Sequence, residues 1–263
     1  MPKSAKRLFV PRSLDANPEA WPGGSVLIYA PCGAGKTRLQ GDMLIYEREF
    51  GKVHFANIKG EEGEGSIRNL GLGSIVYDID CWQTWLEYLS FCEGEKPRAI
   101  ALDSQKALYD LVIDDRCPGR RPVGGEGDKN EWTEIHMEMN KAMTRFRHCA
   151  DVILAVSIAD MSKNMFKETE TGGKLKPQLT PDLSGKMAYN CAGWYDLVGF
   201  LMADTTVSGV NRTVSFQQSS RWLARQRVPN EITEDIVIPH GAGGWKAIRD
   251  ALDKAYKPQE KKQ

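Results

Sequence analysis

The feature that most constrains the fold of this chain is a glycine-rich turn between an apolar run and a helical segment. Residues 25–30 (SVLIYA) are short and apolar, as in a strand buried inside a parallel sheet. Residues 36–49 carry apolar side chains at helical spacing. The turn between them reads APCGAGKT over residues 30–37, and a strand before it with a helix after it is the context of a phosphate-binding loop. The sequence therefore predicts an α/β fold with a phosphate site at one strand end.

Each residue type in this loop has a chemical reason to be there. Glycines let backbone N–H groups turn inward around phosphate oxygens, and the N-terminus of the helix adds a partial positive charge. We expect Lys36 to reach the β- and γ-phosphates and the Thr37 hydroxyl to ligate Mg²⁺. The residues predicted to contact the nucleotide in this loop are Ala30, Pro31, Cys32, Gly33, Ala34, Gly35, Lys36, Thr37 and Arg38. The alternative is a chance match in a glycine-rich turn.

The first position of the loop departs from the usual pattern, which has glycine where this chain has Ala30. Alanine is penalised only where φ must be positive, so a residue at a strand end tolerates it. The loop is therefore still expected to bind phosphate.

A second half of the site is expected at the end of another apolar run. Residues 99–103 (AIALD) finish on Asp103, which fits the Walker B acid that holds Mg²⁺ through water. The alternative for Asp103 is an ordinary cap of the helix that follows. The cofactors predicted from this pair of motifs are ATP and Mg²⁺, although no adenine-reading motif is evident and the choice of ATP over GTP stays open.

Hydrolysis also needs a group that orients or deprotonates water. Glu61 and Glu62 come shortly after the strand candidate 53–58, at the carboxyl edge of the sheet where ligands bind in open α/β folds. Either could be the base, and the alternative is a solvated acidic turn. Ser157, placed at the end of the run 152–157, is expected to contact the γ-phosphate, with an ordinary strand-end serine as its alternative.

The rest of the chain follows the same alternation of strands and helices. A mostly parallel central sheet flanked by helices is expected, with antiparallel strands at one edge because the late strand candidates follow one another without helices. Those candidates are residues 197–202, 212–216 and 222–224. The expected organisation is a basic arm over residues 1–20, one ATPase domain over 21–257 and a charged tail over 258–263.

Composition excludes several classes of protein. Lys and Arg number 35 and so do Asp and Glu, which argues against coating nucleic acid by bulk charge. No apolar run approaches the roughly 20 residues that cross a bilayer, and the basic N-terminus lacks the apolar core of a secretory signal. The six cysteines show no metal-ligand spacing. We expect a cytoplasmic protein with reduced thiols and no membrane partner.

These motifs, in this order, resemble the RecA-like ATPase core, and more closely the phage RecA-like P-loop proteins, short recombinases that work beside single-strand-binding protein. The likeness covers about residues 24–228. It is carried by the loop and the Asp103 run, by the helix–strand unit 132–157, and by the segments 181–186 (PDLSGK), 195–199 (YDLVG) and 223–227 (LARQR). The proline-led segment followed by the Tyr-Asp-Leu-Val-Gly strand is more discriminating than the loop alone.

The resemblance implies an ATPase that acts on single-stranded DNA in recombination or annealing, as a ring or filament in the host cytoplasm if phage-encoded. Glu61 or Glu62 matches the catalytic glutamate, and Arg225 and Arg227 match a basic pair that reaches a neighbouring subunit's phosphate. Two loops, 114–131 and 159–189, match DNA-facing loops, although their net charges are only −1 and +1. The predicted DNA-binding residues are Arg116, Arg120, Arg121, Lys163, Phe166, Lys167, Lys174 and Lys176.

Two departures keep other functions open. Ile158, Ala159 and Asp160 stand where the family often has a His-Glu pair, and the late basic pair is not led by lysine. One alternative is therefore a nucleotide-gated scaffold without catalysis. A separate alternative rests on the arginines of the Gly/Pro-rich loop: a nucleotide or small-molecule kinase, in which Arg116, Arg120 and Arg121 form a lid over two phosphate groups.

Overall fold

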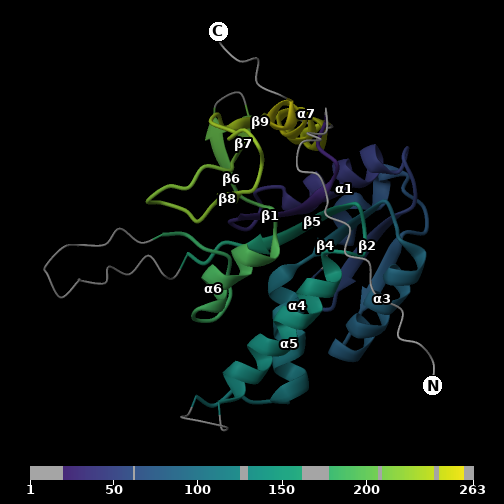
Figure 1. Ribbon diagram of the computed structural model, residues 1–263, viewed down its shortest axis with the longest axis vertical. Helices are drawn as coiled ribbons and strands as arrows, with labels where there is room; N and C mark the ends of the chain where they lie inside the picture. Colours follow the sequence, from purple (N-terminus) through teal and green to yellow (C-terminus); the bar gives the residue numbers. More distant parts are fainter. Residues whose placement is uncertain are drawn as a thin grey trace, which may run out of the picture.

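The computed structural model describes residues 20–61, 63–124, 130–161, 178–206, 209–239 and 243–257. In this part of the chain, nine strands form one sheet with the order β3-β2-β4-β5-β1-β6-β7-β9, and β8 pairs with β6 (Figure 1). The strands are β1 (Gly24–Ala30), β2 (Val53–Ile58), β3 (Val76–Ile79), β4 (Ala99–Asp103), β5 (Val152–Ile158), β6 (Leu197–Thr206), β7 (Gly209–Ser215), β8 (Arg225–Gln226) and β9 (Ile236–Ile238).

Helices cover both faces of the sheet. They are α1 (Lys36–Glu47), α2 (Glu64–Ile67), α3 (Trp82–Glu95), α4 (Gln105–Arg116), α5 (Glu131–Phe146), α6 (Met187–Asn190) and α7 (Gly244–Tyr256), with the 3₁₀ turns η1 (Arg68–Leu70) and η4 (Cys191–Trp194). The first six strands in the sheet order, β3-β2-β4-β5-β1-β6, are parallel to one another. Strands β7, β8 and β9 pair antiparallel with their neighbours. The predicted mostly parallel sheet with an antiparallel edge is therefore confirmed.

Strand β1 lies in the interior of the sheet, and its side chains belong to two hydrophobic cores. Leu27 and Tyr29 face the core beneath α3, α4 and α5, while Val26 and Ile28 face the core beneath α1 and α7. All four side chains are fully buried. Because alternate side chains of a strand point to opposite faces, a strand covered by helices on both faces must be apolar throughout. This is why residues 25–30 read as one continuous apolar run.

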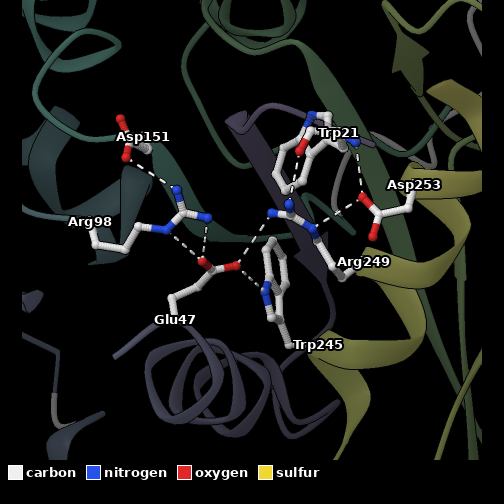
Figure 2. Close-up of polar contacts among 7 residues, drawn as sticks. All are labelled: Trp21, Glu47, Arg98, Asp151, Trp245, Arg249 and Asp253. Atoms are coloured by element: carbon white, nitrogen blue, oxygen red, sulfur yellow. Dashed lines mark hydrogen bonds and ion pairs between the residues drawn. The ribbon is translucent and has the colours of Figure 1, made fainter. Parts of the chain in front are cut away.

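A buried ionic network fastens the far end of α1 to the rest of the domain (Figure 2). Glu47, fully buried at the last position of α1, pairs with Arg98 at 2.8 Å and with Arg249 of α7 at 3.6 Å. The indole Nε1 of Trp245 donates to the same carboxylate at 3.1 Å. Arg249 also donates to the carbonyl oxygen of Trp21 at 2.8 Å, so the start of the described chain and its last helix are held against α1.

The late part of the fold differs from the sequence-based expectation. The predicted strand 222–224 is wrong: Trp222 makes only an isolated bridge with Leu179, and β8 begins at Arg225. Strand β9 was not predicted, because three residues show no clear alternation. The predicted loop 114–131 begins inside α4, which continues to Arg116. No helix in the described ranges is long and apolar enough to cross a membrane.

Candidate active site

The candidate site lies at the carboxyl edge of the sheet, where β1, β2 and β4 end. The loop after β1 leads into α1, and Thr37 at the start of that helix meets Asp103 at the end of β4. The Thr37 hydroxyl donates to Oδ2 of Asp103 at 3.1 Å. Two residues that the sequence singles out for binding one metal ion are therefore brought into contact.

The loop itself has the backbone shape that its glycines allow. Gly33 and Gly35 have φ values of 76° and 97°, in the left-handed region that favours glycine. Ala30 is the last residue of β1 and pairs with Ile158, so alanine carries no conformational penalty there. The ammonium of Lys36 lies within the loop, where it donates to the carbonyl oxygens of Ala30 at 3.1 Å and Pro31 at 3.0 Å. Burial lowers the pKa of Lys36, whereas the nearby acids Asp103 and Glu61 raise it.

Asp103 is an almost fully buried acid with a perturbed titration. Its side chain is 3% exposed, and its pKa is raised to about 6, first by burial and then by the nearby Glu61. The Thr37 hydrogen bond and the Lys36 charge act in the opposite direction. A bound cation would relieve the repulsion between the two carboxylates, and hard oxygen ligands of this type suit Mg²⁺. The residues present therefore fit a magnesium ion held by Thr37 and Asp103.

Glu61 is positioned beside Asp103 by Ser104, the residue that follows Asp103 in the chain. Ser104 Oγ donates to Oε1 of Glu61 at 2.5 Å and also accepts from the backbone N–H of Ala107, which caps α4. The peptide bond between Asp103 and Ser104 is cis. Sequence reasoning missed Ser104, although a serine directly after a strand-end aspartate is a typical helix cap. Glu62, the other predicted base, lies outside the described residues.

Gly63 approaches the site so closely that a side chain would not fit. A Cβ atom added to Gly63 would lie 1.8 Å from Oδ2 of Asp103 and 3.0 Å from the methyl carbon of Thr37. The turn that carries Glu61 is thus packed directly onto the Thr37–Asp103 pair. Glycine is required here by contact, since its φ of −63° is open to any residue.

Gln40 joins helix α1 to the strands beneath it. Its side chain is fully buried, and Nε2 donates to the carbonyl oxygens of Leu102 at 2.8 Å and Leu154 at 3.2 Å. These carbonyls belong to β4 and β5, so Gln40 fixes the distance between the start of α1 and the strand that ends in Asp103. No sequence pattern pointed to this residue.

Other predicted site residues are placed farther from the Thr37–Asp103 pair. Ser157 is not the last residue of its strand, because β5 continues to Ile158; its hydroxyl is buried and donates to the Ile158 carbonyl at 3.3 Å. Arg38 is 44% exposed and lies 3.9 Å from Asp42. Arg225 and Arg227 lie near Asp196, which precedes β6 at the amino edge of the sheet. They are therefore at the opposite edge from the loop of their own chain.

The predicted DNA-binding residues are only partly described. Arg116 is paired with Glu138 of α5, and Arg120 forms a two-pronged ion pair with Glu131 at 2.8 and 2.6 Å. Arg121 is exposed. Lys163, Phe166, Lys167, Lys174 and Lys176 lie outside the described residues. The first loop therefore offers less free positive charge than its sequence indicates.

A cleft of about 530 Å³ opens beside the candidate base. Its lining includes Glu61, Lys59, Asp80, Lys106, Asp110 and Asp114. In the described ranges, no group of three or more His, Cys, Asp or Glu residues is arranged to hold a metal ion. Thr37 and Asp103, which are in contact, would hold a metal ion together with the phosphates of a ligand.

Comparison with known proteins identifies a family for most of the chain. The sequence profile of the AAA domain family matches residues 23–228. Among solved structures, the chain is similar to the flagellar accessory protein FlaH from Methanocaldococcus jannaschii, at 11% identity and a TM-score of 0.44 over 83% of this chain and 86% of that one. It is also similar to an ATPase from the type III secretion system of pathogenic bacteria, at 12% identity and a TM-score of 0.45 over 68% and 52% of the two chains. A comparison with curated proteins finds no match.

Proposed function

The chain belongs to the AAA domain family. From that premise we propose that it is a RecA-like P-loop ATPase that couples ATP hydrolysis to binding of single-stranded DNA in phage-type recombination or annealing. The observation that carries the ATPase part is the contact between Thr37 and Asp103, with Glu61 beside them at the same sheet edge. Phosphoryl transfer to water needs a phosphate-binding loop, a carboxylate that binds the metal ion and a carboxylate that activates the water.

In the proposed reaction, backbone N–H groups of residues 33–37 surround the phosphates and Lys36 neutralises the β- and γ-oxygens. For this, the Lys36 ammonium exchanges its bonds to the Ala30 and Pro31 carbonyls for bonds to phosphate oxygens. Magnesium, held by Thr37 and Asp103, would stabilise the negative charge on the phosphates when bound. Glu61 accepts a proton from the attacking water, and Ser104 keeps its carboxylate in place.

Coupling to DNA is proposed through the segment that follows β5. Ile158 pairs with Ala30, and the backbone N–H of Ala159 donates to the Ala30 carbonyl at 2.9 Å. The segment 159–189, which the resemblance matches to a DNA-facing loop, thus starts in direct contact with the phosphate loop. A change in the loop on nucleotide binding would reach that segment without an intermediate.

A homo-oligomer is proposed from the position of Arg225 and Arg227. Since both lie at the amino edge, they serve nucleotide chemistry only if they reach the carboxyl edge of a second copy. The kinase alternative is disfavoured by the course of α4, whose 12 residues carry Arg116 about 18 Å from the start of the helix. Arg116 is held at this position by its ion pair with Glu138 of α5. Arg120 is held by its ion pair with Glu131, the first residue of α5.

The experiment that tests the proposal is the rate of ATP hydrolysis with and without single-stranded DNA, measured across a protein dilution series. Wild-type protein is expected to hydrolyse ATP, faster with DNA, with a specific activity that falls on dilution. Lys36→Ala is the control for contaminating activity. Turnover by wild type that Glu61→Gln or Glu62→Gln abolishes would dismiss the scaffold alternative and identify the base.

Three results would count against parts of the proposal. A rate unchanged by DNA would remove the DNA coupling. A specific activity that is constant on dilution, and equally reduced at all concentrations by Arg225→Ala, would remove the action across a subunit boundary. Transfer of the γ-phosphate to a nucleoside monophosphate would favour the kinase alternative.

A further inference from the structure

We propose that Arg212 is a positioning residue that holds the phosphate loop in its binding shape from outside; this rests on the proposed nucleotide site. Arg212 lies on β7, 178 residues along the chain from Ala34, and its Nε donates to the Ala34 carbonyl oxygen at 2.9 Å. This contact could not be predicted from the sequence, because β7 and the phosphate loop are far apart along the chain. Nothing in the P-loop motif itself requires an arginine from this strand.

The position of Arg212 follows from the pairing of β7. Its register partners are Ala203 on β6 and Ile238 on β9, so β7 is paired on both sides and its backbone is fixed. Val214, two residues later and on the same face, packs in the core beneath α1 and α7. Arg212 therefore points to the face that carries α1, and its side chain reaches the start of that helix.

The contact has a direct consequence for phosphate binding. In a trans peptide the carbonyl and the N–H of the next residue point in opposite directions. Holding the Ala34 carbonyl outward, toward Arg212, turns the Gly35 N–H to the inner side of the loop, where a phosphate oxygen would accept it. Donors that are oriented before the ligand arrives need no rearrangement when it binds.

The position of Arg212 gives a second reason for glycine at position 35, in addition to the backbone conformation of the loop. Gly35 has a φ of 97°, and a Cβ atom added there would lie 2.9 Å from Arg212 Nε and 3.5 Å from its Cδ. The Arg212 guanidinium lies beside Gly35, so its charge is close to the phosphates that the loop would bind.

The structure also allows a second role for Arg212, contact with the nucleoside part of a nucleotide, and the test must separate the two roles. Arg212 also borders a pocket of about 140 Å³, together with Arg38, Ile238 and Pro239. From there it could contact the nucleoside end of a nucleotide instead of shaping the loop. Inorganic tripolyphosphate separates the two roles, since it can occupy the phosphate loop but has no nucleoside.

The experiment measures the affinity of wild type, Arg212→Gln, Arg212→Lys and the exposed control Arg221→Gln for ATP and for inorganic tripolyphosphate, both with Mg²⁺. We expect Arg212→Gln to weaken both ligands by about tenfold or more, the effect of losing a charged hydrogen bond. Arg212→Lys is expected to retain part of the affinity, because its ammonium can still donate to a carbonyl. Arg221→Gln should bind both ligands like wild type.

The outcomes are separable from failure of the nucleotide site itself. If wild type binds neither ligand, the proposed function fails; if it binds both, the role of Arg212 is decided by the variants. Wild-type affinity of Arg212→Gln for both ligands would overturn the inference, as would a loss confined to ATP, which would assign Arg212 to the nucleoside. Thermal unfolding of each ligand-free variant is measured alongside. Should Arg212→Gln not fold, Arg212→Lys is expected to bind both ligands several-fold more weakly, and wild-type affinity for both would overturn the inference.

Discussion

Thr37 and Asp103 are 66 residues apart in the chain, yet the hydroxyl of one lies 3.1 Å from a carboxylate oxygen of the other. The contact joins the first turn of α1 to the end of β4, with β5 lying between β1 and β4 in the sheet. Gln40 and Gly63 keep the two elements at that distance, one by hydrogen bonds to strand carbonyls and one by the absence of a side chain. Five predictions follow from this arrangement and from the packing that supports it.

Replacing Asp103 with asparagine should stabilise the ligand-free protein at neutral pH. The pKa of Asp103 is raised from an ordinary value of 3.8 to about 6, so the charged form is disfavoured in the folded state. This penalty is fully present above pH 6 and is relieved as the pH falls toward 3.8. Urea unfolding at pH 8 should show Asp103→Asn more stable than wild type by on the order of 2 kcal/mol, and the difference should vanish near pH 4.

The same substitution should separate binding from turnover. Asp103→Asn is expected to keep much of the affinity for ATP while losing most Mg²⁺-dependent hydrolysis. In wild type, protons should compete with Mg²⁺ for Asp103, so that the concentration of Mg²⁺ at half-maximal rate rises below pH 6. A rate whose Mg²⁺ dependence is the same at pH 5.5 and pH 8 would count against the role of this carboxylate.

Gly63→Ala should impair hydrolysis through contact alone. The added methyl group would lie 1.8 Å from Asp103 Oδ2, so the turn carrying Glu61 must move away. Gly65→Ala is the matched control, because a Cβ atom at that position meets nothing within 4 Å. We expect a loss of at least about tenfold in kcat for Gly63→Ala, in the range that misplaced catalytic groups produce, and little change for Gly65→Ala. Equal rates for the two variants would remove the steric argument.

Ser104→Ala should lower kcat more than it raises KM. Ser104 holds the Glu61 carboxylate at 2.5 Å and has no part in the phosphate loop. Without it, Glu61 is free to leave the position from which it accepts a proton, and a loss of about tenfold in kcat is expected. Ser104→Thr, which keeps the hydroxyl, is expected to recover activity. A variant with raised KM and unchanged kcat would point to a binding role instead.

Removing Glu47 should destabilise the whole domain without touching the site. Glu47→Ala would leave Arg98 and Arg249 without their shared buried carboxylate, at a cost of about 3 kcal/mol in the free energy of unfolding. Asp250→Ala on α7 is the control, since the Lys246–Asp250 pair is about 60% exposed on each side. Denaturant unfolding of both variants checks this. Equal stability would mean that the network in Figure 2 does not hold α7 in place.

The sequence was most informative where one short segment carries both a fold signal and a chemical one. Strand β1 and the loop after it are contiguous, and the apolar run before Asp103 marks a buried strand, so both could be placed without knowledge of contacts. Ser104, Gln40 and Arg212 could not be found in this way. Their roles depend on which strands become neighbours, which is set by packing over the whole domain.

The late strands illustrate the same limit. Strand β9 has three residues and β8 has two, too few for an alternating pattern to appear. Their places are fixed by pairing with β6 and β7. The expected strand over residues 222–224 was therefore wrong by a few residues, and with it the local geometry before Arg225.

The central claim is that residues 32–37 surround a triphosphate, and the thiol of Cys32 allows it to be tested at the loop itself. Among the six cysteines, Cys32 and Cys81 are exposed. Cys32 is part of the loop after β1, whereas Cys81 precedes α3 and follows β3, which is separated from β1 by three strands of the sheet. The measurement is the rate of modification of each thiol by a maleimide, with and without Mg²⁺ and ATP. The account predicts that ATP slows the reaction of Cys32 by about tenfold or more, in step with its occupancy of the loop, and leaves Cys81 unchanged. Equal rates at Cys32 with and without saturating ATP would contradict it.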